Sequence, residues 1–326
     1  MRAIVCEDWG DPDTLKLGEL PEPQMYPGQV RIRMRAAGVN FADTVLVRGH
    51  YQEKPKLPFA PGLEGAGEIL EVADDVTDFK PGDQVMAVLS VGGFAEQAVC
   101  NTDTVFPIPK GMDVATAAAF PVAYGTSHIA LAHRANLQPG ETVLVLGAGG
   151  GVGLTAIECA KAMGATVIAA ASSTEKLALA AERGADHIIN YTDDELRVEI
   201  RKLTDGKGVD VVYDPVGGDL AQAAMRSMAW CGRFLVIGFA SGDVPQFPGN
   251  YLLVKNISII GVYWGAYRTQ EPKVFCEGFA ELTRWWEEGK LKPHISQVFP
   301  LADAPKALAM LEGRQSTGRL VIDIDG

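Results

Sequence analysis

The chain lacks the sequence features that define several large protein classes. Its five cysteines are scattered and include no Cys-x-x-Cys pair, which argues against a disulfide framework and a structural zinc ribbon. No apolar run reaches the roughly 18 residues that a membrane-spanning helix needs, and no signal-peptide pattern precedes the acidic Glu7 and Asp8. These absences predict a cytoplasmic protein with reduced thiols and no membrane partner.

The chain also has fewer basic than acidic residues. The chain has 29 basic and 41 acidic residues, and its formal net charge of −12 repels nucleic acids and anionic surfaces. Nucleic acid is therefore not an expected partner. The five histidines show no metal-ligand spacing and are interpreted as surface or half-buried side chains.

The middle of the sequence alternates short apolar runs with helical patterns. This alternation predicts an α/β fold with a doubly wound parallel sheet covered by helices. Nearly continuous apolar composition is typical of strands buried on both faces. Six strands are predicted, at residues 142–147, 166–171, 187–190, 209–214, 234–238 and 257–262.

The rest of the chain follows a different pattern, with short strands separated by glycine and proline turns. This pattern predicts an antiparallel, barrel-like domain to which both ends of the chain contribute. A helix at residues 272–288, with Phe275, Phe279, Leu282 and Trp286 on one face, is expected to help complete it. The predicted strands are residues 29–34, 65–72, 84–87 and 320–324.

A length of 326 residues suits two domains with a cleft between them. The predicted domains are residues 1–121 with 264–326, and residues 122–263.

A glycine cluster follows the first strand of the parallel series and precedes a helix. Residues 144–153 read Leu-Val-Leu-Gly-Ala-Gly-Gly-Gly-Val-Gly. A pyrophosphate needs close backbone approach and unpaired amides at a helix N-terminus, and glycines leave room for both. Within a series of βαβ units, the spacing Ala148-x-Gly150-x-x-Gly153 predicts a dinucleotide site, although alanine replaces the first glycine of the usual fingerprint.

The end of the second strand bears on the choice of cofactor. NAD-binding proteins place an acidic residue there, which hydrogen-bonds the ribose hydroxyls, but residues 169–173 read Ala-Ala-Ala-Ser-Ser. Without a carboxylate, a 2′-phosphate meets no repulsion, and Ser172, Ser173 and Lys176 can donate hydrogen bonds to it. NADPH is therefore expected in preference to NADH, with a solvated helix lysine as the alternative interpretation of Lys176.

Several separate segments resemble one known family. They are residues 37–43 (Ala-Gly-Val-Asn-Phe-Ala-Asp), 61–67 (Pro-Gly-Leu-Glu-Gly-Ala-Gly), 81–85 (Pro-Gly-Asp-Gln-Val), the glycine cluster and 214–218 (Asp-Pro-Val-Gly-Gly). Over nearly its full length the chain is similar to zinc-independent medium-chain dehydrogenases/reductases, specifically NADPH:quinone oxidoreductases. The resemblance implies a Rossmann domain and a GroES-like catalytic domain of antiparallel β-barrel type.

The resemblance also implies that no metal is bound. Zinc-dependent relatives have a cysteine at the position of Asn40 and a histidine at the position of Leu63, and asparagine and leucine cannot build that catalytic site. The four-cysteine structural zinc loop of those relatives is missing as well, because the chain passes from segment 82–85 directly to Gly-Gly-Phe-Ala at 92–95.

The family's functional residues carry over to matching positions. Asn40 and Tyr51 are the candidate catalytic residues, which would hydrogen-bond the carbonyl oxygen of the acceptor as charge develops. The expected cofactor-binding residues are Asn40, Thr126, Gly150, Gly151, Val152, Ser172, Lys176, Tyr191, Phe239, Tyr263 and Arg314. Val45 replaces another tyrosine common in the family, which leaves the preferred acceptor open.

Besides Lys176, three of these residues have a second interpretation. Tyr191 fits a core aromatic at a strand end, and Arg314, from the last helix, fits a surface ion pair. Tyr263 and the adjacent Trp264 fit interdomain packing as well as a substrate slot.

The expected activity is direct hydride transfer from NADPH to a quinone or related α,β-unsaturated carbonyl stacked over the nicotinamide in the cleft. An enoyl-thioester or 2-alkenal reductase is the closest alternative, and Arg48, Lys54 and Lys56 are candidate basic residues for an acyl-CoA, although surface lysines explain them equally. An NADPH-binding protein with little turnover is the alternative of another class. The resemblance further implies a homodimer, formed through the edge strand at residues 256–262.

Overall fold

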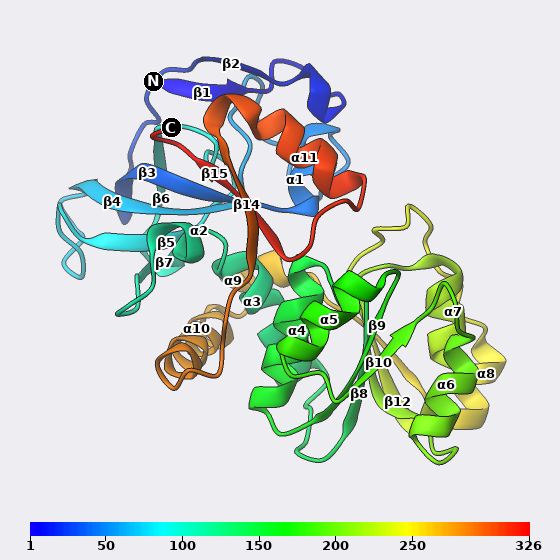
Figure 1. Ribbon diagram of the computed structural model, residues 1–326. Coiled ribbons are helices and arrows are strands. Elements are labelled where there is room, and N and C mark those ends of the chain that lie inside the picture. The colour runs from blue at the N-terminus through cyan, green and yellow to red at the C-terminus, as the bar shows by residue number, and fades with distance from the viewer. The chain divides into compact units, whose positions relative to one another are not determined.

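The computed structural model describes the whole chain, residues 1–326, as two compact units. Unit 1 comprises residues 1–122 and 293–326, and unit 2 comprises residues 123–292. Figure 1 shows a β-sheet at the centre of each unit, with both termini in unit 1. None of the helices is long and apolar enough to cross a membrane.

Unit 2 is built on a six-stranded sheet in which every strand pair is parallel. The strand order is β10-β9-β8-β11-β12-β13. The chain therefore begins at the central strand β8, adds strands outward to β10, and then adds the other half of the sheet from β11 to β13. The strands are β8 (Thr142–Leu146), β9 (Thr166–Ala171), β10 (His187–Asn190), β11 (Val209–Asp214), β12 (Met228–Val236) and β13 (Ser258–Gly261). The predicted doubly wound sheet is confirmed.

Helices cover this sheet because its central strands are apolar on both faces. Residues 143–146 of β8 and 211–213 of β11 are completely buried. The helical segments of the unit are α3 (Pro121–His128), which begins in unit 1, a π-helical segment η3 (Ile129–Arg134), α4 (Gly151–Ala162), α5 (Thr174–Glu182), α6 (Leu196–Leu203), α7 (Gly218–Arg226), α8 (Gly249–Lys255), η4 (Trp264–Ala266), α9 (Tyr267–Gln270) and α10 (Pro272–Glu287).

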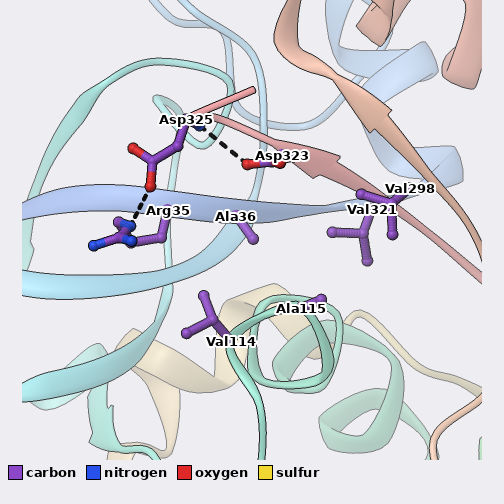
Figure 2. A pocket seen from close by; sticks show the side chains of 8 residues that line it. All are labelled: Arg35, Ala36, Val114, Ala115, Val298, Val321, Asp323 and Asp325. Atoms are coloured by element: carbon purple, nitrogen blue, oxygen red, sulfur yellow. Dashed lines mark hydrogen bonds and ion pairs between the residues drawn. The ribbon is translucent and has the colours of Figure 1, made fainter.

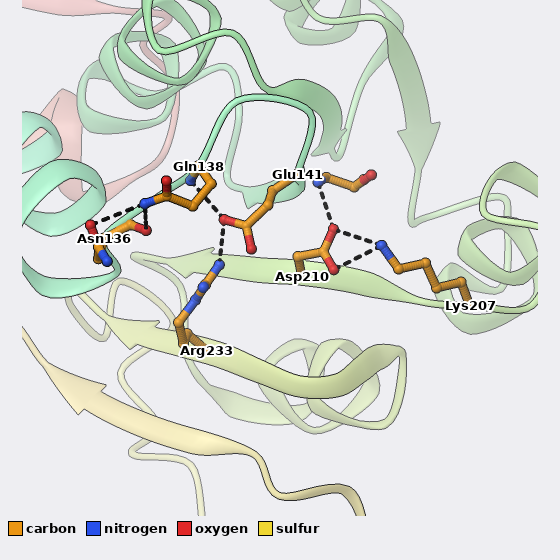
Figure 3. Close-up of polar contacts among 7 residues, drawn as sticks. Asn136, Gln138, Glu141, Lys207, Asp210 and Arg233 are labelled. Atoms are coloured by element: carbon orange, nitrogen blue, oxygen red, sulfur yellow. Dashed lines mark hydrogen bonds and ion pairs between the residues drawn. The ribbon is translucent and has the colours of Figure 1, made fainter.

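Polar contacts join the amino ends of β8 and β11 to each other and to Arg233 within β12 (Figure 3). Glu141 accepts hydrogen bonds from Arg233, at 2.7 Å, and from the backbone N–H of Gln138, at 2.8 Å. Asp210 accepts from the backbone N–H of Thr142, at 2.9 Å, and pairs with Lys207. The loops of the candidate site leave from the opposite, carboxyl edge of the sheet.

Unit 1 contains a seven-stranded sheet and a separate antiparallel pair, β1 with β2. The order of the larger sheet is β14-β15-β3-β4-β5-β7, and β6 also pairs with β3; only β14 and β15 run parallel. The strands are β1 (Arg2–Val5), β2 (Lys16–Glu19), β3 (Gln29–Val39), β4 (Glu64–Val72), β5 (Gln84–Val88), β6 (Gln97–Asn101), β7 (Val105–Pro107), β14 (Ile295–Pro300) and β15 (Arg319–Asp323). The predicted antiparallel domain, with a strand from the C-terminal end, is confirmed.

Unit 1 also contains short helices, and α11 packs against α1. They are η1 (Pro12–Thr14), α1 (Phe41–Val47), η2 (Thr102–Thr104), α2 (Val114–Ala118), η5 (Leu301–Asp303) and α11 (Ala304–Glu312).

The observed units correct the predicted boundary at 263/264, because residues 264–292 fold with unit 2. The ring of Trp264 packs against Phe275 and Phe279 and fills the space beside Gly125, where a Cβ atom would lie 2.4 Å from Trp264 Cζ2. The helix predicted at 272–288 is α10, and its buried tryptophan is Trp285, not Trp286. Aromatic packing therefore ties this helix to unit 2.

A buried carboxylate ties the last residues of unit 2 to its other helices. Glu158 of α4 accepts hydrogen bonds from the hydroxyl of Tyr124, at 2.6 Å, and from the backbone N–H of Lys292, at 3.0 Å. Burial raises the pKa of Glu158, and these donors oppose the shift.

Candidate functional site

The glycine cluster forms a tight turn between the centre of the parallel sheet and α4. Gly147 has a φ of +59°, and a Cβ atom on Gly153 would lie 2.4 Å from the carbonyl oxygen of Gly147. Gly150 is the N-cap of α4, so the backbone N–H groups of Gly151, Val152 and Gly153 begin the helix without intrahelical acceptors. Small residues and unpaired amides give this turn the features of a pyrophosphate site.

The second strand of the sheet ends beside this turn. The N–H of Tyr191 donates to the carbonyl of Ala171, at 3.2 Å, which brings the ends of β10 and β9 together. Ser172 is exposed, and Ser173 caps α5 through a hydrogen bond from the N–H of Lys176. The side chain of Lys176 lies across the glycine turn, because a Cβ atom on Gly149 would lie 2.5 Å from Lys176 Cβ. The glycine turn, Ser172, Lys176 and Tyr191 thus lie at the same edge of the sheet.

Two further loops at this edge are joined to each other. Asp214, at the end of β11, is buried, and its Oδ1 accepts hydrogen bonds from the N–H groups of Val216 (2.8 Å) and Gly217 (2.9 Å). Burial raises the pKa of Asp214, and the two N–H donors oppose this shift. The loop after β12 returns across this turn and carries the exposed Phe239, whose Cδ1 lies 3.4 Å from the Cβ position of Gly217.

Thr126 lies on α3, which a hydroxyl network holds against α4 and β11. Ser127 Oγ lies 2.8 Å from Thr155 Oγ1 and 3.0 Å from the hydroxyl of Tyr213. Ser127 and Thr155 also donate to the carbonyl of Val152, next to the glycine turn. This network was not predicted from the sequence, although a serine, a threonine and a tyrosine within apolar segments were a visible clue.

In unit 1, Asn40 belongs to a buried cluster of polar groups. It stands where β3 passes into α1, and its backbone N–H donates to Asp43 Oδ2, at 2.8 Å. Its side-chain Nδ2 donates to Glu64 Oε1, at 2.9 Å. Arg319 pairs with the same oxygen of Glu64. Glu64 and Arg319 are functional candidates that were not predicted from the sequence, because strand register, which motif spacing does not reveal, brings them together.

Asp43 is fully buried in this cluster. Burial raises the pKa of its carboxyl from 3.8 to about 7; the Asn40 N–H bond and the positive Arg319 lower the pKa, and the negative Glu64 raises it. Oδ1 of Asp43 has no hydrogen-bond partner. A carboxyl in this setting carries a proton over much of the weakly acidic range.

The remaining candidates lie at separate places. Tyr51 follows α1 and packs, half buried, against the apolar core of unit 1. Arg314 is exposed just beyond the end of α11, with a φ of +54°, rather than within the last helix. Tyr263 of unit 2 is exposed, whereas its neighbour Trp264 is buried in aromatic packing within that unit.

The residues at the position of the relatives' zinc site do not fit a metal ion. Asn40 supplies an amide that already donates to Glu64, Leu63 supplies no ligand atom, and Glu64 is paired with Arg319. No group of three or more histidine, cysteine, aspartate or glutamate side chains in the chain could hold a metal ion.

The surface of unit 1 also contains a pocket unrelated to these residues (Figure 2). An ion pair between Arg35 and Asp325 borders it, and Val114, Val298 and Val321 contribute apolar walls. None of the predicted site residues lines it. This pocket therefore marks neither the backbone turn of unit 2 nor the buried cluster of unit 1.

A parallel sheet in this order, with a glycine turn at its carboxyl edge and a separate antiparallel unit, is the architecture of a dinucleotide-dependent oxidoreductase. Two family models match the chain. "Alcohol dehydrogenase GroES-like domain" matches residues 26–110, and "Zinc-binding dehydrogenase" matches residues 151–279.

Similar proteins cover nearly the whole chain. The mouse (Mus musculus) "Quinone oxidoreductase-like protein 2" is 42% identical over 99% of this chain and 92% of its own length. The human (Homo sapiens) "Quinone oxidoreductase" is 33% identical over 99% of this chain and 97% of its own length. The crystal structure of Escherichia coli quinone oxidoreductase complexed with NADPH matches with a TM-score of 0.91 and 28% identity, over 99% of this chain and 100% of that one. The chain belongs to the quinone oxidoreductase family of medium-chain dehydrogenases/reductases.

The raised pKa of Asp43 predicts a pH-dependent stability that Asp43→Asn removes. An aspartate whose folded pKa is about 7 binds more protons folded than unfolded, so its contribution to stability falls as the pH rises from about 4 to 7. The unfolding free energy of Asp43→Asn relative to wild type should therefore rise by at most about 1.4 kcal/mol per pH unit in that window and level off above it.

Urea unfolding at several pH values measures this difference. The exposed Asp13→Asn serves as the matched control and should show no such trend. A constant difference between Asp43→Asn and wild type across the window would show that Asp43 is ionised throughout.

Proposed function

We propose that this protein is an NADPH-dependent oxidoreductase that transfers a hydride to a quinone or related α,β-unsaturated carbonyl without zinc. The observation that carries the proposal is the edge of the parallel sheet where the glycine turn, Ser172, Lys176 and Tyr191 come together. Similar proteins named quinone oxidoreductase, one of them determined with NADPH, support the same function.

The residues of this edge fit NADPH. The N-terminus of α4 offers backbone N–H groups to the pyrophosphate, and the glycines leave room for its approach. β9 ends in Ala171 and Ser172 with no carboxylate that would repel a 2′-phosphate. We assign Lys176, Tyr191 and Ser172 to that phosphate and Gly150, Gly151 and Val152 to the pyrophosphate. Arg314 is proposed as a further cation for the phosphate.

Residues around the other half of the cofactor would position it for reaction. We assign Thr126 to the nicotinamide side because the network of Ser127, Thr155 and Tyr213 fixes α3 beside the glycine turn. Phe239 and Tyr263 follow neighbouring strands and would exclude water from the nicotinamide.

When bound, NADPH would supply a hydride from C4, which together with one proton from solvent would convert a quinone to a hydroquinone and leave NADP⁺. Asn40 and Tyr51 are the side chains we propose for hydrogen bonding to the reacting groups, Asn40 also to the nicotinamide. Because a hydroquinone oxygen can take its proton from water, this reaction needs no dedicated acid.

One observation favours the quinone or enone over an acyl-CoA. Arg48 was a candidate for binding the phosphates of an acyl-CoA, but its guanidinium makes two hydrogen bonds to Glu312 and a third to Asp11. These carboxylates neutralise its charge, and they raise its pKa further. Lys54 and Lys56 remain exposed lysines.

The direct test is NADPH oxidation, followed by absorbance in the presence of a metal chelator, with matched panels of quinones, 2-alkenals and enoyl-CoA esters. We expect turnover with quinones or enones and strong preference for NADPH over NADH. Preference for enoyl-CoA would identify the alternative enoyl-thioester reductase. NADPH binding without turnover of any acceptor would identify a binding protein, and dependence on added zinc would refute zinc independence.

Lys176→Ala tests the assignment of the 2′-phosphate. Loss of one charge-assisted hydrogen bond is expected to weaken NADPH binding about tenfold and to leave NADH binding unchanged. Fluorescence titration with both cofactors measures this difference. Lys202→Ala, which removes an exposed lysine of α6, is the matched control. An equal effect on NADPH and NADH would contradict the assignment.

We also propose a homodimer formed through β13, the edge strand of the parallel sheet. α8, which precedes this strand, exposes Leu253 and Val254, which a second copy could cover. Light scattering should show a dimer that Gly261→Lys dissociates, because no atom lies within 4 Å of a Cβ at Gly261 and only pairing with another chain would be disturbed. Ile188→Lys on the other edge strand, β10, should leave the dimer intact. A monomeric wild type would contradict the proposal.

A further inference from the structure

Two opposite charges meet inside unit 1 across a strand that separates them in the sheet. Glu64 is the first residue of β4 and Arg319 the first residue of β15, and β3 lies between these strands. The register pairs Leu320 with Val39 on one side of β3 and Ala66 with Ala36 on the other. Both charged residues therefore lie beside the end of β3, where the chain continues into Asn40. Their side chains are 0% and 7% exposed.

The pair can form because β3 has a glycine at the crossing point. A Cβ atom on Gly38 would lie 2.4 Å from Glu64 Oε1 and 2.7 Å from the carbonyl oxygen of Ala118. The missing side chain thus provides the space that the Glu64 carboxylate occupies.

The Glu64 carboxylate accepts hydrogen bonds from three donors. Oε1 accepts from Asn40 Nδ2 and from Arg319, and Oε2 accepts from the backbone N–H of Val122, at 2.8 Å. Arg319 is anchored in turn, because its Nε donates to the carbonyl of Ala119, at 3.1 Å. An ionised carboxylate accepts from all three donors and has no proton of its own to place. Burial raises the pKa of Glu64, and Arg319, the Val122 N–H and the Asn40 amide oppose that shift. The Asn40 amide is consequently held with its nitrogen toward Glu64.

Stability alone gives little reason for such a pair. Desolvation of two buried charges costs about as much as their attraction returns, and apolar side chains of similar volume often do as well or better. What an apolar pair cannot do is accept the hydrogen bond of Asn40. We propose that Glu64, held by Arg319, is a positioning residue that sets the orientation of the Asn40 amide for hydride transfer. This inference rests on the proposed function of Asn40.

The test compares two doubly substituted proteins. Glu64→Leu with Arg319→Met removes both buried charges and the acceptor of Asn40, while keeping the volume approximately constant. Glu141→Leu with Arg233→Met removes a partly buried pair that joins the amino end of β8 to β12 (Figure 3) and is the matched control. Thermal unfolding establishes that both are folded. Glu64→Met with Arg319→Leu replaces the first variant if that one does not fold, because it removes the same acceptor with a different distribution of apolar volume.

Two measurements distinguish a change in the orientation of the Asn40 amide from a general loss of structure. In wild type, the Asn40 side-chain amide should give a resolved ¹H–¹⁵N signal, assigned through its loss in Asn40→Ala. This signal should shift in the Glu64 variant and stay in place in the control. Single-turnover hydride transfer should fall about 10- to 100-fold in the Glu64 variant, with the NADPH dissociation constant unchanged within about twofold. Adding Asn40→Ala to that variant should slow transfer no further, because the two changes remove the same contact.

Each outcome decides between the inference and the proposed function. An unshifted Asn40 signal, or wild-type hydride transfer in the Glu64 variant, overturns the inference while the proposed function stands. A wild type that transfers no hydride to any acceptor overturns the proposed function, and the amide signal still decides whether Glu64 orients Asn40. Equal slowing in the Glu141 variant would show a general loss of stability and would also overturn the inference.

Discussion

The close approach of backbone to backbone at the glycine turn is the constraint on which unit 2 depends. Residues 143–146 of β8 are completely buried at the centre of the sheet, and α4 must begin directly beyond the end of this strand. The Cβ positions of Gly153 and Gly149 lie 2.4 Å and 2.5 Å from neighbouring atoms, so the helix and Lys176 can approach only because these side chains are absent. The same approach leaves the first N–H groups of α4 free for an anion.

In unit 1, the missing side chain of a glycine likewise makes room for a close contact, here between two charged side chains. Gly38 opens β3 so that Glu64 and Arg319 can meet across it, and their pairing reaches Asn40 at the strand end. Where zinc-dependent relatives would hold a metal, this chain holds an amide with a carboxylate. Under the proposed function, a hydrogen-bonding group would take the place of a Lewis acid at this position, in keeping with an acceptor whose reduced oxygens take protons from water.

Patterns local in sequence were predictable, and contacts set by distant strand pairing were not. The strands at 166–171, 187–190 and 209–214 follow from apolar runs, and the glycine turn from its spacing between a strand and a helix. Arg319 reads as an ordinary basic residue until the register of β15 against β3 places it beside Asn40. Residues 264–292 were assigned to the wrong unit because an amphipathic helix shows which face it buries but not its partner.

Hydride transfer from NADPH is the central claim, and isotope transfer tests it most directly. NADPH carrying deuterium at the transferred position of C4 would be reacted with an α,β-unsaturated ketone in a metal chelator, and the product examined by mass spectrometry and NMR. The account predicts one deuterium bonded to carbon in the reduced product, with NADP⁺ formed in equal amount. A reduced product without deuterium, or deuterium transfer only after zinc is restored, would contradict it.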